Sequence, residues 1–376
     1  MNGLPLAGIV VVELGHSVAA PVAGQILSDL GAEVVKVEKP AGDDARKWGP
    51  PNLDGEAATF KAINRNKRSV VCELRDPVQR GQLVDFIVRE ADVILQNLRP
   101  GQVKELGLDA DSLRAKKPAL VYCNVGAFGA RGPLADKPGY DPLMQAFGGI
   151  MSVVGEEGRP PVRVGPSIID QGTAMWGTIG ILSALYQRRA TGQGAVVDVS
   201  LFETSAAWMT IHAAWFLGSG EIPQRYGSGQ GGIVPYKAYA TKDGFLVVAA
   251  GNDNLFKRLS AVLGHPEWPA DARFRTNPDR VAHADALYPM IDMEMAKRTN
   301  AQWAQLLEEA GVPCAPAQNV KQMLSHPQMQ ALGLLQPVPG SSQPLIGLPI
   351  SFDGERPQPR SASPALGAHT KEVLGS

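Results

Sequence analysis

The sequence predicts an α/β fold with a mostly parallel, doubly wound sheet. Strand-like apolar runs alternate with helix-like segments through the first 130 residues, which is typical of βαβ units. Beyond residue 226 the pattern changes to a hairpin followed by amphipathic helices, which indicates a smaller α+β domain. A chain of 376 residues is long enough for one large domain and a smaller one.

The elements of the large domain follow in order. GIVVVEL is a buried strand, and PVAGQILSDLGA is the helix that follows it. Four more strands are expected at EVVKVEK, SVVCEL, VILQN and LVYCNVGAFG, with the helix VQRGQLVDFIVREA before VILQN. The turn after the first strand reads LGHSVAAPVAG and lacks GxGxxG, so the fingerprint of a dinucleotide site is missing.

The second half of the chain continues with two helices at 170–190 and 202–218, around a short strand AVVDVSL. YKAYAT and FLVVAA resemble a hairpin with Asp243 and Gly244 at its turn, and NAQWAQLLEEAG is an amphipathic helix. We place the small domain at 226–320, with linkers at 201–225 and 321–334. The tail from LIGLPISFDG to LGAHTKEVL has a strand, loop and helix pattern that does not reveal which domain it joins.

Composition and charge argue against several classes of function. The formal net charge of −1 provides no bulk field toward nucleic acid or an anionic membrane. Three cysteines without a CxxC pair argue against a disulfide framework or a zinc site, and fit a reduced compartment. No basic leader begins the chain, and no unbroken apolar run reaches roughly the 18 residues of a membrane span. We expect a cytoplasmic protein with no metal and with no nucleic-acid or membrane partner.

Asp170 is the most informative single residue. It is the only acid in PVRVGPSIIDQGTAMWG. A helix pattern with one apolar face follows it, made of Met175, Ile179, Leu182 and Tyr186. Asp170 therefore lies in the first turn of a helix, where backbone N–H groups are unpaired. Taken locally it is a capping residue, and the alternative is a nucleophilic carboxylate in a pocket of small residues.

Seven blocks of sequence extend over nearly the whole chain. They are LGHSVAAPVAGQILSDLGAEVVKVEKP, NRNKRSV, ADVILQNLRPG, GYDPLMQAFGGIMSVVG, GPSIIDQGTAMWGTIGILSALYQRRATGQGAVVDVSLFE, GVPCAPAQNV and LGAHTKEVL. In this order they resemble CoA-transferase family III, the CaiB/BaiF or formyl-CoA transferase-like group. The resemblance implies a large Rossmann-like domain built from both chain ends, 1–200 and 335–376. It also implies an interlocked homodimer in which each chain threads through the other.

The same resemblance makes Asp170 the nucleophile of a CoA transfer from an acyl-CoA to a carboxylic acid. The carboxylate attacks the thioester to form an acyl-aspartyl anhydride, and the CoA thiolate then forms an aspartyl-CoA thioester. The acceptor carboxylate regenerates an anhydride and the thiolate takes the new acyl group, so no metal or redox cofactor is needed. We expect backbone N–H groups at the Asp170 turn to stabilise the oxyanions.

The CoA site also follows residue by residue from the resemblance. Its members are His16, Ser17, Val18, Ala19, Lys39, Cys72, Asn97, Leu98, Arg99, Lys104 and Tyr140. Lys and Arg suit phosphates as charge-assisted donors, although each taken alone reads as a solvated surface charge. Cys72 taken alone is an inert core thiol, and His16 a hydrogen-bonded turn residue.

A glycine-rich segment resembles the loop that closes over the active site in transferases of this group. It contains Gly227, Gly229, Gln230, Gly231 and Gly232. Glycines permit close approach of the backbone, and Gln230 is the side chain long enough to reach a ligand. The local alternative is an ordinary linker between domains.

Two other functions compete with the transferase. An α-methylacyl-CoA racemase needs two proton-transfer groups, one of them a histidine in a Gly-His-Asp segment. Here that segment is Gly139-Tyr140-Asp141, and tyrosine is rarely ionised near neutral pH. The other alternative is a non-catalytic acyl-CoA-binding protein, in which Asp170 would be dispensable. The chain is shorter than the formyl-CoA transferases, chiefly near the small domain, which argues against oxalate or formate as the substrate. From relatives of similar length we expect succinyl-CoA as donor and a dicarboxylate as acceptor.

Overall fold

The computed structural model describes residues 3–375 and divides into two compact units. Unit 1 combines the chain up to Ile150 with Val164–Ile211 and the chain from Pro327 onward. Unit 2 combines Met151–Arg163 with His212–His326. The segment 201–225, predicted as a linker, is shared between the units and carries the helices α8 (Leu201–Trp208) and α9 (Thr210–Ser219).

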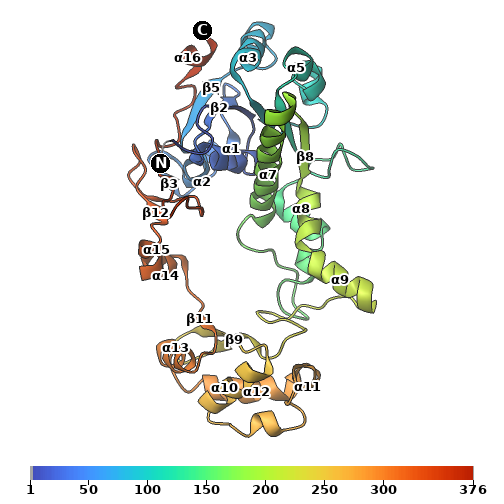
Figure 1. The fold of residues 1–376 in the computed structure, drawn as a ribbon, viewed down its shortest axis with the longest axis vertical. Helices are drawn as coiled ribbons and strands as arrows, with labels where there is room; N and C mark the ends of the chain where they lie inside the picture. The colour runs from blue at the N-terminus through green and yellow to red at the C-terminus, as the bar shows by residue number, and fades with distance from the viewer. Residues whose placement is uncertain (1–2, 376) are drawn as a thin grey trace. The chain divides into compact units, whose positions relative to one another are not determined.

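Unit 1 is built on a six-stranded sheet in the order β5-β2-β1-β6-β7-β8 (Figure 1). The strands are β1 (Val10–Leu14), β2 (Glu33–Glu38), β5 (Lys67–Val71), β6 (Val93–Gln96), β7 (Val121–Gly126) and β8 (Val196–Ser200). Every neighbouring pair is parallel, which confirms the predicted parallel sheet. The strand order reverses between β1 and β6, as in doubly wound folds that bind a ligand at that point.

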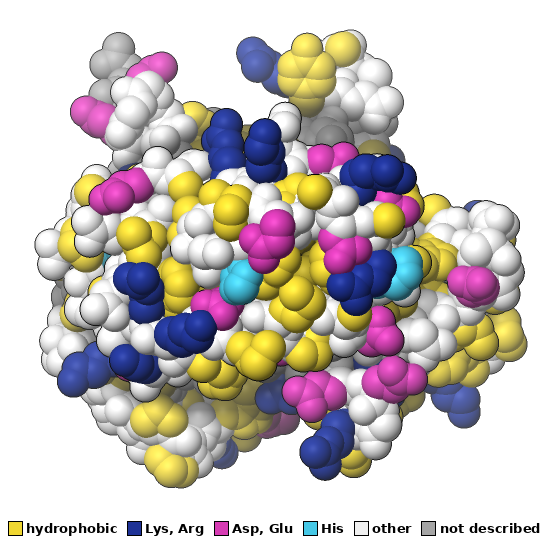
Figure 2. All heavy atoms as spheres, turned by 90° about the horizontal axis from the view of Figure 1, so that it is seen from below, with side chains coloured by type: hydrophobic (Ala, Val, Ile, Leu, Met, Phe, Trp, Pro, Cys, Tyr) yellow, Lys and Arg dark blue, Asp and Glu magenta, His cyan; other side chains and the backbone are white. Residues whose placement is uncertain are grey.

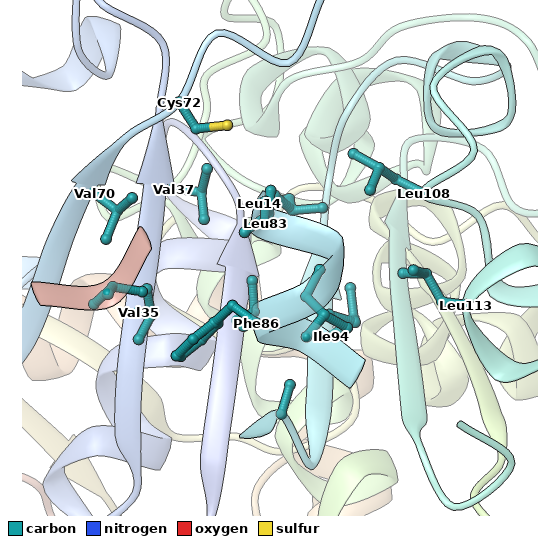
Figure 3. Packing of buried hydrophobic residues seen from close by; sticks show 14 of the residues in the cluster. Leu14, Val35, Val37, Val70, Cys72, Leu83, Phe86, Ile94, Leu108 and Leu113 are labelled. Atoms are coloured by element: carbon teal, nitrogen blue, oxygen red, sulfur yellow. The ribbon is translucent and has the colours of Figure 1, made fainter. Parts of the chain in front are cut away.

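Helices cover both faces of this sheet because its side chains alternate with a period of two. On one face, α3 (Pro77–Glu90) packs Leu83 and Phe86 against Val35 and Ile94 of the strands (Figure 3). The short helices α5 (Ala110–Lys116) and α16 (Thr370–Leu374) contribute to the same apolar cluster. On the other face, α1 (Ala19–Asp29) and α7 (Ile168–Thr191) pack against each other.

The remaining elements of unit 1 are short. They are α2 (Ala58–Ile63), α4 (Gln102–Glu105), α6 (Asp141–Phe147), α15 (Pro327–Ala331), β3 (Asn52–Leu53) paired with β4 (Glu56–Ala57), and β12 (Leu335–Gln336) paired with β13 (Leu345–Ile346). The end of the chain attaches to β5, where Val71 N donates to Thr370 Oγ1 at 2.9 Å and His369 N donates to Ser69 O at 2.9 Å. Both ends of the chain therefore contribute to unit 1.

Unit 2 has a three-stranded antiparallel sheet in the order β11-β10-β9. Its elements are β9 (Tyr236–Ala240), β10 (Phe245–Ala249), α10 (Asp253–Val262), α11 (Asn277–Ala282), α12 (Ala284–Met295), α13 (Asn300–Glu309), β11 (Cys314–Pro316) and α14 (Val320–Ser325). The predicted hairpin is confirmed, and Thr241 N donates to Gly244 O at 2.9 Å across its turn. Tyr239, Leu246 and Trp303 belong to a core separate from that of unit 1.

Surface charge is mixed on the face that Figure 2 shows, where Lys and Arg side chains lie among Asp and Glu. This mixture is in keeping with the net charge of −1. Among residues 3–375, no helix has the length and apolarity that a bilayer crossing requires.

A buried ionic cluster lies between β1 and α1. The fully buried Glu13 carboxylate accepts hydrogen bonds from Lys36 Nζ at 3.0 Å and from Lys67 Nζ at 2.8 Å. Lys36 also donates to Gly15 O at 2.8 Å and pairs with Asp43 at 2.9 Å. A Cβ at Gly24 of α1 would overlap the Oε2 atom of Glu13. The buried carboxylate therefore requires glycine at that point of the helix.

We predict that Gly24→Ala lowers the free energy of unfolding by about 2–4 kcal/mol, because the added methyl group displaces a buried, paired carboxylate. Urea denaturation measures the effect. The matched control is Gly81→Ala in the middle of α3, where an added Cβ meets nothing within 4 Å. That variant should be neutral, or gain about 0.5–1 kcal/mol from helix propensity. Equal effects of the two substitutions would contradict the prediction.

Candidate active site

A pocket of about 1020 Å³ opens at the carboxyl ends of the strands of unit 1. His16 follows β1, Lys39 follows β2 and Asn97 follows β6, and all three line the pocket. The strand order reverses between β1 and β6, where the crevice of a doubly wound sheet binds its ligands. All residues that line this pocket belong to unit 1.

Side chains from other parts of the sheet fix the turn between β1 and α1. His16 N donates to Asn97 Oδ1 at 2.9 Å, and Asn97 Nδ2 donates back to His16 O at 2.9 Å. Ser17 has a left-handed backbone with φ of 67°, and its N–H donates to Asp43 Oδ1 at 3.2 Å. Burial lowers the pKa of His16, so its imidazole is neutral near pH 7. The turn thus presents a neutral, positioned surface to the pocket.

Asp170 is the third residue of α7 and is not its cap. Ser167 precedes the helix and makes no side-chain capping bond. The N–H groups of Ile169 and Asp170 instead donate to Oδ2 of Asp141 at 2.8 and 3.3 Å. The interpretation of Asp170 as a capping residue is therefore wrong. So is the expectation that these N–H groups stabilise an oxyanion, because Asp141 occupies them.

The Asp170 carboxyl is half-buried and lines the pocket together with Tyr140. Burial raises the pKa of Asp170 to about 7, and repulsion from the Asp141 carboxylate adds to the rise. A carboxyl group with this pKa is partly ionised at neutral pH and more basic than an ordinary aspartate. Such a group in a pocket is suited to nucleophilic catalysis.

Comparison with known proteins places this pocket in a family. A model of CoA-transferase family III matches residues 6–370. This chain belongs to CoA-transferase family III. It is 38% identical to the succinate–glutarate CoA-transferase of Agrobacterium fabrum, over 98% of this chain and 95% of that protein. It is 35% identical to the succinyl-CoA:glutarate CoA-transferase of Mus musculus, over 98% of this chain and 86% of that protein.

A solved structure extends the comparison to the fold. A CaiB/BaiF family protein from Brucella suis is 38% identical to this chain, with a TM-score of 0.89. The match covers 99% of each chain. The resemblance read from the seven sequence blocks is thereby confirmed at the level of the family, and the chain is a CoA-transferase.

The pocket brings together nearly all of the residues predicted for a family III CoA site. Those that line it are His16, Ser17, Val18, Ala19, Lys39, Cys72, Asn97, Leu98, Arg99 and Tyr140. Lys104 lies on α4 and is not among the lining residues. The Cys72 thiol is 1% exposed, and burial raises its pKa to about 11, so it is protonated at neutral pH. Lys39 pairs with Asp44 at 2.7 Å on the surface.

The glycine loop belongs to unit 2, so its closure over the pocket stays a prediction. Within unit 2, Gly227 N donates to Gly155 O at 2.9 Å and Gly229 N donates to Tyr226 O at 2.8 Å. Ser228 Oγ accepts from Ala238 N at 3.0 Å. These bonds attach the part of the loop that precedes Gln230 to its own unit.

Several residues of the site escape a reading of the sequence. Arg75 and Lys137 line the pocket, but a lone charge in a loop carries no local signal. Asp43 lies in a loop and supports the first turn only through tertiary contacts. Glu13 and Lys36 do have a usable signal, because each is a charge inside an apolar strand run and must find a partner.

We predict that Asp170→Asn stabilises the fold at pH 8 by about 1–2 kcal/mol, less than the full pKa shift implies because the group is half-buried. The carboxyl of Asp170 has a raised pKa, so the native state holds its proton more tightly than the unfolded state. Ionisation therefore costs stability as the pH rises from about 4 to about 7, and costs nothing below about 4. Denaturation at pH 4 and pH 8 measures the difference.

The matched control is Asp109→Asn, which alters the N-cap of α5, where the Asp109 carboxylate accepts from Ser112 N at 3.1 Å. Hydrogen bonds from the hydroxyl and the N–H of Ser112 lower the pKa of Asp109, so this substitution should destabilise the protein at pH 8. A gain at pH 4 as large as that at pH 8 for Asp170→Asn would refute the assigned ionisation.

Proposed function

We propose that this chain transfers CoA from succinyl-CoA, or a similar acyl-CoA, to a small dicarboxylic acid. The observation that carries the proposal is the position of the Asp170 carboxyl. It lies in the first turn of α7 and lines the pocket at the point where the strand order reverses. Succinate, succinyl-CoA and glutarate appear in the names of the relatives from Agrobacterium fabrum and Mus musculus, which supports this choice of substrates.

The reaction proceeds through covalent intermediates on Asp170. Its ionised carboxylate attacks the thioester carbonyl, and the C–S bond breaks. CoA departs as a thiolate, and the acyl group remains on Asp170 as an acyl-aspartyl anhydride. The thiolate attacks the aspartyl carbonyl, which releases the donor acid and leaves an aspartyl-CoA thioester. The acceptor carboxylate then forms a second anhydride and frees the thiolate. Attack on the new acyl carbonyl yields the product thioester and regenerates Asp170, without a metal or redox cofactor.

The pocket offers suitable groups for the CoA moiety. Lys39 follows β2 and Arg99 follows β6, the strands on either side of β1, and both provide the charge-assisted donors that phosphates favour. The neutral His16 turn lies between these cations and adds no charge of its own. Tyr140 is 60% exposed and lines the same wall as Asp170, where the thioester would bind.

We propose further that the protein is a homodimer of interlocked chains. The predicted apolar face of α7 is largely exposed within one chain, with Met175 at 51%, Ile179 at 50% and Tyr186 at 78%. Trp176 beside them is 43% exposed. Monomeric proteins rarely expose a contiguous apolar surface of this kind. A second copy of the chain is the occupant that the family resemblance implies.

We predict that Asp170→Ala and Asp170→Asn abolish CoA exchange while binding of CoA persists, because neither side chain offers an anionic oxygen. Exchange is measured by mass spectrometry of the CoA products over a panel of donors and acceptors. In the wild type, hydroxylamine should trap the activated carboxyl as a hydroxamate on the peptide that contains Asp170. Substantial exchange by both variants would exclude Asp170 as the nucleophile.

The same preparation separates the alternatives. A racemase would exchange the α-proton of a 2-methylacyl-CoA with D₂O and would leave no adduct on Asp170. A non-catalytic acyl-CoA-binding protein would show neither reaction, although the wild type and both variants would bind CoA equally. An Asp170 adduct without α-deuteration is the outcome that supports the transferase.

We predict that Ile179→Glu on the exposed face of α7 disrupts the dimer, because a carboxylate in an apolar interface lacks a partner. Light scattering at micromolar concentration should give a dimer for the wild type and monomer or aggregate for the variant. Val78→Glu is the control, since Val78 is 68% exposed at the start of α3 and lies outside the apolar face of α7. A stable wild-type monomer would contradict the proposed dimer.

A further inference from the structure

The helix that carries the nucleophile depends on another helix for its first hydrogen bonds. Asp141 is the first residue of α6, and its carboxylate is 2% exposed. Its Oδ2 accepts from Ile169 N at 2.8 Å and from Asp170 N at 3.3 Å. The neighbouring N–H of Ile168 donates to Pro166 O at 2.8 Å. Asp141 therefore takes the place of the side-chain cap that α7 lacks.

A second buried side chain holds Asp141 in this position. Gln145 lies one turn further along α6 and is fully buried. Its Nε2 donates to Asp141 Oδ1 at 2.6 Å, and its Oε1 accepts from Val164 N at 2.8 Å. Gln145 thus connects the cap to the irregular segment that leads into α7. With its two oxygens bonded on different sides, the Asp141 carboxylate has little freedom to rotate.

We propose that Asp141 and Gln145 form a positioning pair that orients the Asp170 carboxylate for attack on the thioester, an assignment that rests on the proposed function of Asp170. The pair does not touch the reacting atoms; it acts through the backbone of Asp170, whose N–H it holds. Effective nucleophilic attack requires the carboxylate oxygen to stay at a fixed distance and angle from the bound carbonyl carbon. The first turn of α7, fixed by two buried side chains, keeps the Asp170 carboxylate in that position.

The pair also places a negative charge next to the nucleophile. Charged or titratable groups that line the pocket together with Asp170, on elements that pack against α7, include Asp141 and Tyr140 at the start of α6, Glu203 of α8 and Asp198 of β8. Repulsion from Asp141 contributes to the raised pKa of Asp170, second to burial. The Asp141 carboxylate consequently affects both the position and the ionisation of Asp170, and a suitable set of variants can separate the two effects.

The test exchanges the chemistry of the two side chains. Asp141→Asn keeps the shape but leaves either a donor facing Gln145 Nε2 or a donor facing the N–H groups of α7. The double variant Asp141→Asn with Gln145→Glu restores complementarity. Asn can donate to Glu at 145, whose other oxygen still accepts from Val164 N. In the double variant the carboxylate therefore lies one turn further along α6, and it no longer accepts from the N–H of Asp170. Gln145→Glu alone places two carboxylates in contact.

We expect each single variant to lower kcat for CoA exchange by about tenfold or more, with little change in KM, because the register of Asp170 is lost while the CoA-lining residues are untouched. The double variant should recover most of kcat. In the pH profile of kcat/KM, the acid limb of the wild type should lie at about pH 7. The acid limb of the double variant should lie at lower pH, because the displaced charge repels the Asp170 carboxylate less. A recovered kcat together with a shifted acid limb is not expected if the two residues only stabilise the fold.

A second readout needs no turnover. The pH dependence of unfolding, compared with and without Asp170→Asn in each background, reports the pKa of Asp170 directly. It should fall in Asp141→Asn and in the double variant. If the wild type showed no CoA exchange, the proposed function would fail, and this titration would still test the contact between Asp141 and Asp170.

Two outcomes would overturn the positioning pair. One is an Asp141→Asn variant with wild-type kcat and an unchanged pKa of Asp170. The other is a double variant that regains the wild-type unfolding midpoint but not kcat. Asp109→Asn is the control for loss of a capping carboxylate, and it should leave kcat and the acid limb unchanged.

Discussion

The pairing of Glu13 with Lys36 and Lys67 beneath the sheet is the constraint on which the pocket depends. A carboxylate without exposure to solvent is tolerated only when opposite charges and hydrogen bonds compensate it. Lys36 also donates a hydrogen bond to Gly15 O and forms an ion pair with Asp43. The Asp43 carboxylate in turn accepts a hydrogen bond from the N–H of Ser17. The ionic cluster therefore sets the backbone of the turn that forms one wall of the site.

Side chains distant in sequence also hold the starts of two helices that begin at the pocket, α1 and α7. Neither Val18 at the start of α1 nor Ser167 at the start of α7 makes a side-chain capping bond. Partners distant in sequence fix these regions instead: Asn97 holds the turn before α1, and Asp141 holds the first turn of α7. Helix starts held from outside are positioned relative to the rest of the site, which a local cap would not achieve.

The helix α7 combines two roles at different points along its length. Its glycine at 172 allows α8 to approach, since an added Cβ would lie 2.9 Å from the Thr204 and Trp208 side chains. Thr173 strengthens that contact through its hydroxyl, which donates to Thr204 at 2.8 Å. The exposed apolar residues Met175, Trp176 and Ile179 lie on the same side of the helix, one to two turns after Gly172. A helix that packs closely against α8 at its start and exposes apolar residues further along can join the first turn that carries Asp170 and the proposed subunit interface in one rigid element.

The sequence by itself determined the family, the parallel strands, the hairpin of unit 2 and the position of Asp170 in the first turn of a helix, because these depend on apolar periodicity and ordered motifs. Only the tertiary structure decided that Asp141 caps α7, since the two residues belong to separate segments and capping across segments has no local signal. Register between β1 and β2 likewise brings Glu13 opposite Lys36. The spacing of apolar residues predicted an apolar face on α7. Only the structure shows that no other part of the described chain covers most of this face, because exposure depends on every neighbouring element.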